Sequence, residues 1–141
     1  MTIYADTSVF VSLYLPDAHS KEAQQHMAQH LRVWLTPLHR AEWTHAIGQH
    51  VFQHNITSRE AQSVYRDFER DREAGVWMEI GLPEGAFEAC IRLARNRVAR
   101  LGVRTLDTLH VAIALELQAE YFWTFDRRQA KLAEAEGLKT L

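Results

Sequence analysis

Apolar residues follow two different spacings in this 141-residue chain, and the two spacings alternate. Short runs such as "TIYA" (2–5) and "VWLT" (33–36) are almost entirely apolar, which is typical of strands covered on both faces. Longer segments such as 39–54 repeat apolar residues every three or four positions, which predicts amphipathic helices. The expected strands are 2–5, 33–36, 76–80, 121–124 and 138–141, and the expected helices are 8–14, 20–31, 39–54, 58–74, 83–102, 106–119 and 126–137.

Capping and breaking residues mark several boundaries of these elements. Pro37 closes the second strand, and Thr57 with Glu60 forms the capping-box pattern at the start of a helix. Gly102 and Gly137 stand where two later helices are expected to end. Strands separated by helices need crossover connections, so the chain predicts an α/β fold with a parallel sheet covered on both faces. Its length favours one domain over residues 1–141.

Composition narrows the class of protein without identifying it. Hydrophobic residues make up 47% of the chain and charged residues 24%, as in ordinary globular proteins. The net charge of −2 means that a nucleic acid would have to be held by local basic clusters or by metal. Cys90 is the only cysteine, so an internal disulfide is excluded. No apolar run reaches the length of a membrane span and no signal-peptide pattern opens the chain, so we expect a cytoplasmic protein.

Asp6 interrupts the first apolar run, between "TIYA" and "TSVFVSLY". Burying a carboxylate is costly unless it is paired, hydrogen-bonded or neutralised. In open parallel sheets, however, functional groups gather beyond the carboxyl ends of the strands, where Asp6 and Asp126 both stand. If their two strands are neighbours, these aspartates lie about 5 Å apart across the sheet.

Four acids stand near the beginnings of helices or at strand-to-helix turns. Each alone could act as an N-cap or complement a helix dipole. If all four converge, their repulsion would raise some pKa values unless a cation joined them. An all-oxygen cluster suits Mg²⁺ or Mn²⁺, which can activate water and stabilise a phosphoryl transition state. The set therefore suggests metal-assisted phosphodiester hydrolysis, and its members are Asp6, Glu42, Asp107 and Asp126.

Four segments in order resemble the motifs of PIN-domain proteins, most of all the VapC-like toxins of type II toxin–antitoxin systems. They are "YADTSVFVSLY", "HRAEWTHAI", "LDTLHVAIAL" and "WTFDRRQAKLAEAEGLKTL". The resemblance implies a three-layer α/β/α fold whose five-stranded parallel sheet has the order 3-2-1-4-5. It also implies a Mg²⁺- or Mn²⁺-dependent endoribonuclease that cleaves RNA and is inhibited by a cognate antitoxin.

The same resemblance assigns roles to residues of this chain. Asp6 and Asp107 would be direct metal ligands, while Glu42 and Asp126 would complete the catalytic set, directly or through water. Of the supporting residues, Thr7 or Ser8 would hydrogen-bond within the site, and Thr124 would orient the fourth acid. Phe125 departs from the family, which often has a small polar residue at that position.

Arginines and histidines add candidates for substrate binding. Arg100 and Arg104 precede Asp107 and could grip RNA phosphates, or they could belong to a solvated helix face. His110 follows Asp107 by one helical turn and could contact the scissile phosphate, orient Asp107 or serve the structure. The pairs His26/His30 and His50/His54 have chelating spacing but lie among glutamines, which favours solvated side chains.

Helix 8–14 is apolar nearly all round, so it is either deeply buried or covered by a partner. The resemblance implies both a homodimer and an antitoxin bound near such helices. Two other functions remain open. A non-catalytic RNA- or protein-binding scaffold of the same fold is one. An aspartate-based phosphatase is the other, although that chemistry usually needs a second aspartate where Ser8 stands.

Overall fold

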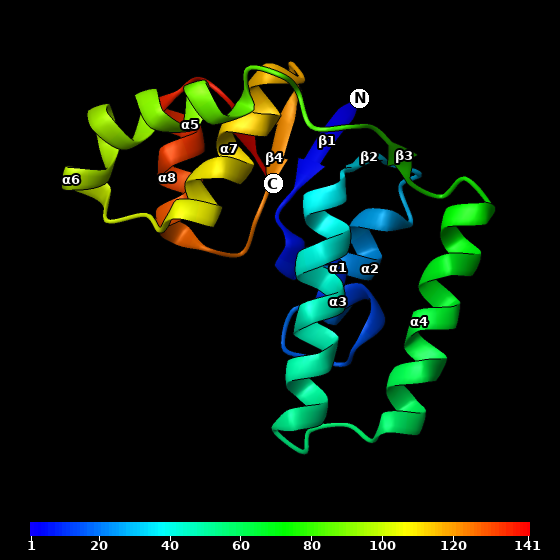
Figure 1. Ribbon diagram of the computed structural model, residues 1–141. Helices are drawn as coiled ribbons and strands as arrows, with labels where there is room; N and C mark the ends of the chain where they lie inside the picture. The colour runs from blue at the N-terminus through cyan, green and yellow to red at the C-terminus, as the bar shows by residue number, and fades with distance from the viewer.

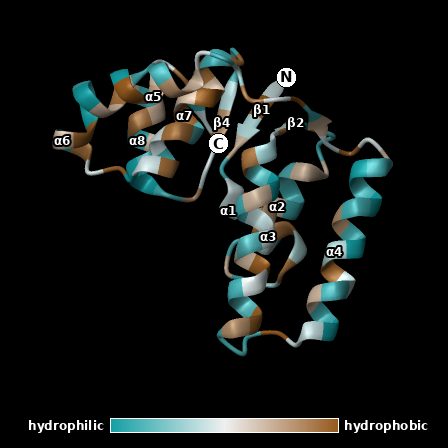
Figure 2. Cartoon of the chain, in the orientation of Figure 1, coloured by the Kyte–Doolittle hydropathy of each residue, from teal (hydrophilic) through white to brown (hydrophobic).

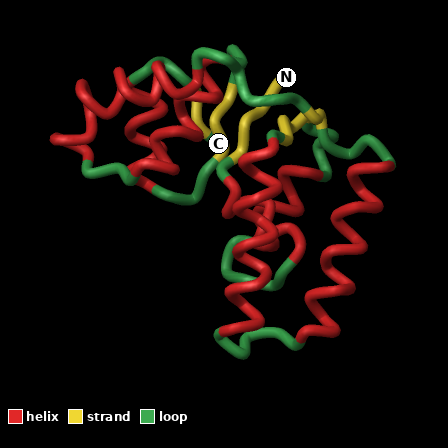
Figure 3. The backbone as a smooth tube through the Cα atoms, viewed as in Figure 1, coloured by secondary structure: helices red, strands yellow, loops and turns green.

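The computed structural model describes residues 1–141 and contains one five-stranded sheet in the order β3-β2-β1-β4-β5. All four neighbouring pairs of strands are parallel, and the strands lie together between two groups of helices (Figures 1 and 3). The α/β fold expected from the sequence pattern and the strand order implied by the family resemblance are therefore confirmed. The strands are β1 (Thr2–Ala5), β2 (Arg32–Leu35), β3 (Met78–Glu79), β4 (Tyr121–Trp123) and β5 (Lys139–Thr140).

Helices connect every pair of consecutive strands. One group covers one face of the sheet and the other group covers the opposite face, so the chain forms three layers (Figure 1). The first group is α1 (Thr7–Tyr14), α2 (Ser20–Met27), α3 (Pro37–Phe52) and α4 (Ser58–Glu73). The second group is α5 (Ala86–Leu93), the π-helical turn η1 (Ala94–Val98), α6 (Ala99–Leu101), α7 (Thr105–Glu116) and α8 (Arg127–Ala135).

Alternate residues of the central strands supply the two hydrophobic cores. Ile3 and Ala5 of β1 pack with the first group of helices, whereas Tyr4 between them packs with α5, α7 and α8. In β4, Trp123 belongs to the first core and Phe122 to the second. Because successive side chains of a strand point to opposite faces, a continuously apolar strand serves both cores.

Helix α7 is the most enclosed helix of the second layer. Every residue from Thr108 to Ala114 is buried, and α7 packs closely on α5. Figure 2 shows the contrast with α4, which is largely hydrophilic and turns only part of its surface inward. Two polar residues, Thr108 and His110, are thus held within an apolar helix that leads away from Asp107.

The boundary between β2 and α3 lies earlier than the sequence suggested. The strand ends at Leu35, and Thr36 caps a helix that begins with Pro37. Proline suits the first helical position because its missing N–H would have no partner there. The side chains of Thr36 and His39 also complete a reciprocal capping box, a role that histidine rarely signals in a sequence. By contrast, the predicted capping box of Thr57 and Glu60 is confirmed.

The long helix predicted over residues 83–102 is interrupted. Its α-helical part starts at Ala86, and a π-helical turn occupies Ala94–Val98 before the short helix α6. Within this turn, Arg97 donates to Glu136 at the end of α8 at 2.9 and 3.1 Å. Gly102, with φ of +67°, ends α6 as expected. None of the helices combines the length and hydrophobicity that a bilayer span requires.

Candidate functional site

Strands β1 and β4 are neighbours, and their carboxyl ends carry two of the four candidate acids. Ala5 is in register with Trp123, and the backbone N–H of Asp6 donates to the carbonyl of Trp123 at 2.8 Å. Asp6 is buried and caps α1, where its Oδ2 accepts from the N–H of Ser8 at 3.2 Å and from its hydroxyl at 2.5 Å. These hydrogen bonds at the edge of the sheet therefore offset the cost of burying the Asp6 carboxylate.

Asp107 reaches the same edge from α7, and Gln129 joins it to Asp6. The Nε2 of Gln129 donates to Asp6 Oδ1 at 3.2 Å and to the backbone carbonyl of Asp107 at 3.1 Å. The carboxylate of Asp107 is partly buried and pairs with Arg104 at 3.0 Å. Gln129 thus links Asp6 to the start of α7, where Asp107 lies.

Asp126 follows β4 and is exposed. Its Oδ1 accepts from the backbone N–H groups of Arg128 at 2.8 Å and of Gln129 at 3.0 Å, so it caps α8. The hydroxyl of Thr124 accepts from the backbone N–H of Asp126 at 3.0 Å. Asp126 lies at the rim of the group formed by Asp6 and Asp107, with its side chain turned to the helix N-terminus.

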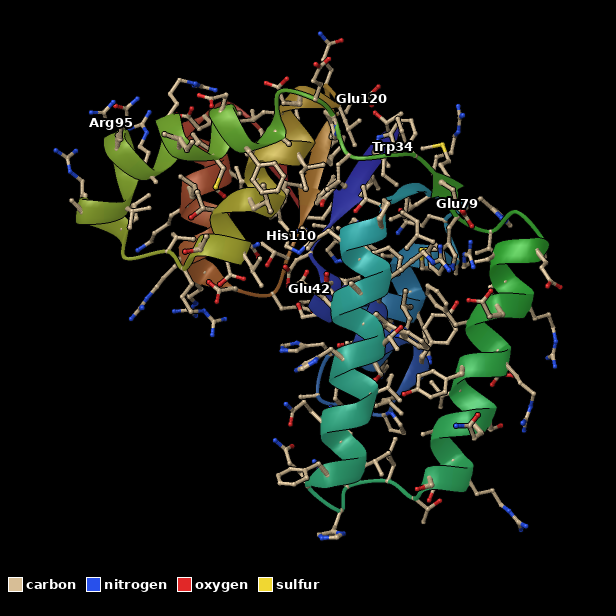
Figure 4. The ribbon with its side chains drawn as sticks, in the orientation of Figure 1. Trp34, Glu42, Glu79, Arg95, His110 and Glu120 are labelled. Carbon is tan, nitrogen blue, oxygen red and sulfur yellow. The ribbon has the colours of Figure 1, made fainter.

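Glu42 approaches from α3, on the opposite side of the sheet from α7. Its Oε1 accepts from the hydroxyl of Thr7 at 2.7 Å and is hydrogen-bonded to Nε2 of His110. Figure 4 shows Glu42 and His110 facing one another where the two groups of helices meet. Tyr4 lies behind the histidine, with its hydroxyl 2.7 Å from Nδ1. The site is therefore assembled from both outer layers.

The charge state of Tyr4 defines the role of His110. Burial raises the pKa of the Tyr4 hydroxyl well above its ordinary value, so this hydroxyl keeps its proton and can donate to Nδ1. Nε2 then carries the hydrogen that bonds to Glu42. Nε2 also lies 3.9 Å from Asp6 Oδ1. With its ring buried and both nitrogens engaged within the protein, His110 positions Glu42 in this structure.

A second buried histidine, His39, fixes the strand that carries Asp6. Its Nδ1 accepts from the backbone N–H of Thr36 at 2.9 Å, which leaves the hydrogen on Nε2. Nε2 lies 2.7 Å from the carbonyl oxygen of Ala5, immediately before Asp6. Burial lowers the pKa of His39 to about 3, and the nearby His110 adds to this effect.

The pKa values of two acids shift in opposite directions. Burial raises the pKa of Asp107, and the charges of Asp6 and Asp126 add to that increase, while Arg104 opposes it. Burial also disfavours the charged form of Glu42, but hydrogen bonds from His110 and Thr7 outweigh it and lower the pKa. Burial is the largest cause of the increase for Asp107, and Arg104 offsets only part of it.

An arginine-lined hollow opens beside these acids. It has a volume of about 510 Å³ and includes Arg104, whose side chain is mostly exposed. Arg100 lies on α6 and does not line the hollow, so the structure separates the two arginines that the sequence grouped. The residues that line the hollow are Gly102, Val103, Arg104, Asp107, Phe125, Asp126, Arg127 and Arg128.

No set of three or more His, Cys, Asp or Glu side chains is grouped here in a way that would hold a metal ion. Glu42 and Asp126 are turned to protein partners, as described above. The donor set nevertheless fits a hard divalent cation in type, because Asp6 and Asp107 supply carboxylate oxygens at the same edge of the sheet. Asp6 and Asp107 are the two residues best placed to bind such a cation.

Other side chains considered in the sequence have local contacts or are buried, namely His26, His50, Phe125 and Cys90. His26 stacks on Trp123 with ring centroids 5.3 Å apart, and His50 is bonded to Asn55 at 3.1 Å. Phe125 stacks on His19, with ring centroids 4.2 Å apart, so it packs the loop after β4 against the loop after α1. Cys90 is buried, and burial raises the pKa of its thiol.

Three buried residues of the site were missed by the sequence reasoning. Tyr4 looked like an ordinary core residue of an apolar strand, and His39 like one of many histidines. Gln129 carried a detectable signal, because a glutamine three residues after Asp126 has the spacing of a helix capping box. Its partners Asp6 and Asp107 are so distant in the chain that their meeting depends on the fold.

Comparison with solved structures supports the fold described above. VapC20 of Mycobacterium tuberculosis, described as a sarcin-ricin loop cleaving toxin, has a TM-score of 0.71 and 17% identity, covering 96% of this chain and 95% of that chain. VapBC2 of Rickettsia felis, solved with a promoter DNA fragment, has a TM-score of 0.67 and 15% identity. The match covers 100% of this chain and 98% of that chain. FitAcB of Neisseria gonorrhoeae has a TM-score of 0.71 and 12% identity, and the match covers 99% of this chain and 96% of that chain.

The search of curated proteins gave no significant match. The family model described as "PIN domain" matches residues 3–135, a range that includes all four candidate acids. Because this match extends over nearly the whole chain, the protein belongs to the PIN domain family.

Proposed function

We propose that this protein is a Mg²⁺- or Mn²⁺-dependent endoribonuclease that acts as a toxin and is restrained by a cognate antitoxin. The observation that carries this proposal is the approach of Asp6 and Asp107 at the carboxyl edge of β1 and β4, bridged by Gln129. VapC20, which has a similar fold, is described as a sarcin-ricin loop cleaving toxin. The catalytic set is Asp6, Glu42, Asp107 and Asp126.

The four acids divide between two tasks in this proposal. Asp6 and Asp107 would hold the cation, while Glu42 and Asp126 would contact it directly or through water. Thr7 and His110 hold the Glu42 carboxylate in its ionised form, since both hydrogen-bond to it. When bound, a divalent cation would lower the pKa of a water molecule and offset charge on the phosphoryl group.

The arginine-lined hollow is the proposed phosphate-binding rim. Arg104, Arg127 and Arg128 line it beside Asp107 and Asp126. Guanidinium groups bind phosphate oxygens with a matching planar geometry, so they would orient the RNA backbone across the acids. We assign this task to Arg104 in place of the Arg100–Arg104 pair, because Arg100 does not line the hollow.

The proposed partners follow from similar proteins and from the surface of this one. VapBC2 and a further similar structure from Klebsiella pneumoniae are described by names that pair a toxin with an antitoxin. We expect a homodimer as well, because Phe87 and Ile91 expose large apolar side chains one turn apart on α5. We place the protein in the cytoplasm, where its RNA substrates and antitoxin would be made.

A non-catalytic RNA- or protein-binding scaffold is the second candidate. It is favoured by the protein-bound state of two acids: Glu42 is engaged by His110 and Thr7, and Asp126 caps α8. A scaffold would bind RNA or a partner equally well with or without Mn²⁺ and would leave the RNA intact. The two functions therefore differ in one measurable property, which is metal-dependent cleavage.

The test measures cleavage of a labelled structured RNA by the purified protein. The reaction is run with Mn²⁺ in excess over the protein and is repeated after a chelator has removed the metal. We expect cleavage by the wild type, none after chelation, and a loss in Asp6→Asn of at least about 100-fold, since that residue is a proposed ligand. Asp67→Asn is the matched control, because Asp67 lies on α4 in a surface ion pair with Arg70. Equal cleavage by wild type and Asp6→Asn would remove the acid cluster from the mechanism.

A further inference from the structure

Gln129 is a neutral polar residue buried among charged ones. Its side chain is 1% exposed, and the neighbouring buried positions of α8 are the apolar Leu132 and Ala133. A buried amide is costly unless its donors and acceptor are bonded, and here all of them have partners. The acceptor Oε1 takes the hydroxyl of Thr124 at 2.7 Å, and Nε2 bonds to Asp6 and Asp107.

The orientation of the amide follows from its neighbours. A carboxylate oxygen of Asp6 and a backbone carbonyl of Asp107 are both acceptors, so the NH₂ end must face them. On the other side, Thr124 receives the N–H of Asp126 at 3.0 Å, which leaves its own hydrogen for Gln129 Oε1. The bonds therefore run in one direction, from the start of α8 through Thr124 and Gln129 to Asp6.

This arrangement restrains Asp6 on both oxygens. Ser8 bonds to Oδ2 and Gln129 to Oδ1, so the carboxylate is fixed in rotation. Because glutamine is uncharged, it does this without neutralising the aspartate. An arginine or lysine in the same place would compete with a cation for the negative charge. The second hydrogen bond, to Asp107, also fixes the start of α7 relative to β1.

We infer that Gln129 is a positioning residue that pre-orients the Asp6 carboxylate, without reducing its charge, and the start of α7 that carries Asp107, for binding of a divalent cation. This inference rests on the proposed function and deepens it by adding a residue that the four acids do not include. Outer hydrogen-bond partners of metal ligands typically contribute about 10- to 100-fold in metal affinity. Thr124 acts one step further out, by holding the Gln129 amide in its orientation.

The test is Mn²⁺ binding measured by electron paramagnetic resonance on the purified full chain, with RNA cleavage as a second readout. We expect Gln129→Met, which keeps the length and removes the donors, to raise the Mn²⁺ dissociation constant about 10- to 100-fold. Gln25→Met on the exposed face of α2 is the matched control and should bind as the wild type does. A Gln129→Met constant within twofold of the wild type would overturn the inference.

A second pair of variants covers the case in which Gln129→Met does not fold, as judged by thermal unfolding of the metal-free protein. Thr124→Val removes the hydroxyl while keeping Gln129, and Thr124→Ser restores it. The inference expects weaker Mn²⁺ binding in Thr124→Val and near-wild-type binding in Thr124→Ser, and equal binding in both would overturn it. If the wild type itself binds no Mn²⁺, the proposed function fails together with this inference. If the wild type binds Mn²⁺ and Gln129→Met binds it equally well, only the role of Gln129 is overturned.

Discussion

His39 illustrates how a single neutral side chain supports the site from a distance. It joins the N-terminus of α3 to the end of β1 through Thr36 and the carbonyl of Ala5. Tyr4 and Phe10 pack on its ring with centroids 4.7 and 4.9 Å away. Because the His39 ring is buried, its protonated form is destabilised, and this lowers its pKa.

The stability of the protein should therefore depend on the charge of His39. In the unfolded chain this histidine takes a proton below about pH 6.5, whereas the folded protein resists protonation down to about 3. Its contribution is complete above pH 6.5 and decreases as the pH falls toward 3, by up to about 1.4 kcal/mol per pH unit. Between pH 7.5 and 5.0 we expect a loss of about 2 kcal/mol in the free energy of unfolding from this residue.

Urea unfolding of the wild type, His39→Gln and His45→Gln at these two pH values measures this contribution. His45 is exposed on the same helix, so His45→Gln should keep the wild-type dependence on pH. His39→Gln should be less stable at pH 7.5 but lose less on acidification. An identical loss in all three proteins would show that His39 is not the residue responsible.

At the scale of elements, loops and helix ends decide which arginines reach the acids. The segment from Gly102 to Arg104 connects α6 to α7, and Arg104 caps α7 in extended conformation beside Asp107. The positive φ of Gly102 allows the chain to reverse there. Arg100 remains on α6, before this reversal, and is left outside the hollow.

This difference predicts separate effects of Arg104→Ala and Arg100→Ala on RNA binding. Measured in the Asp6→Asn background so that RNA stays intact, Arg104→Ala should weaken binding and reduce the slope of log Kd against log salt by about 0.7 to 1. Arg100→Ala should change neither quantity. Equal losses in the two variants would place the RNA on the outer surface of α6 and not over the hollow.

Element order was predictable from the sequence, but some element shapes were not. Buried strands such as 2–5 and capped helices such as that after Thr57 carry local signals, and the structure contains both. The π-helical turn at Ala94–Val98 carries no such signal, since its Arg97 is tied to Glu136, 39 residues further along the chain. Contacts of that range depend on how α5 and α8 pack.

At the scale of the whole molecule, the site exists because two separately packed layers meet at one edge of the sheet. Glu42 belongs to the layer of α3, and His110 belongs to α7 in the other layer. Asp6 lies between them at the end of a central strand. The sequence could identify the four acids by type and order, but not the partners Tyr4 and Gln129, which the tertiary fold brings from over 100 residues away.

A further consequence concerns the whole protein in its cell. An endoribonuclease of this kind should leave new RNA ends that depend on Asp6, and a scaffold of the same shape should leave none. Production of the Asp6→Asn protein should therefore be tolerated at levels at which the wild type is harmful, with the two proteins equally abundant. The antitoxin would relieve the effect of the wild type.

Mapping of RNA 5′ ends after induction of the wild type and of Asp6→Asn is the most direct measurement. We expect discrete new ends at a small number of RNA sites in the wild type, and none of these ends with Asp6→Asn at equal protein level. The same ends should form when purified protein and Mn²⁺ are added to isolated RNA. Identical end profiles for the two proteins would contradict the assignment of this chain as a metal-dependent endoribonuclease.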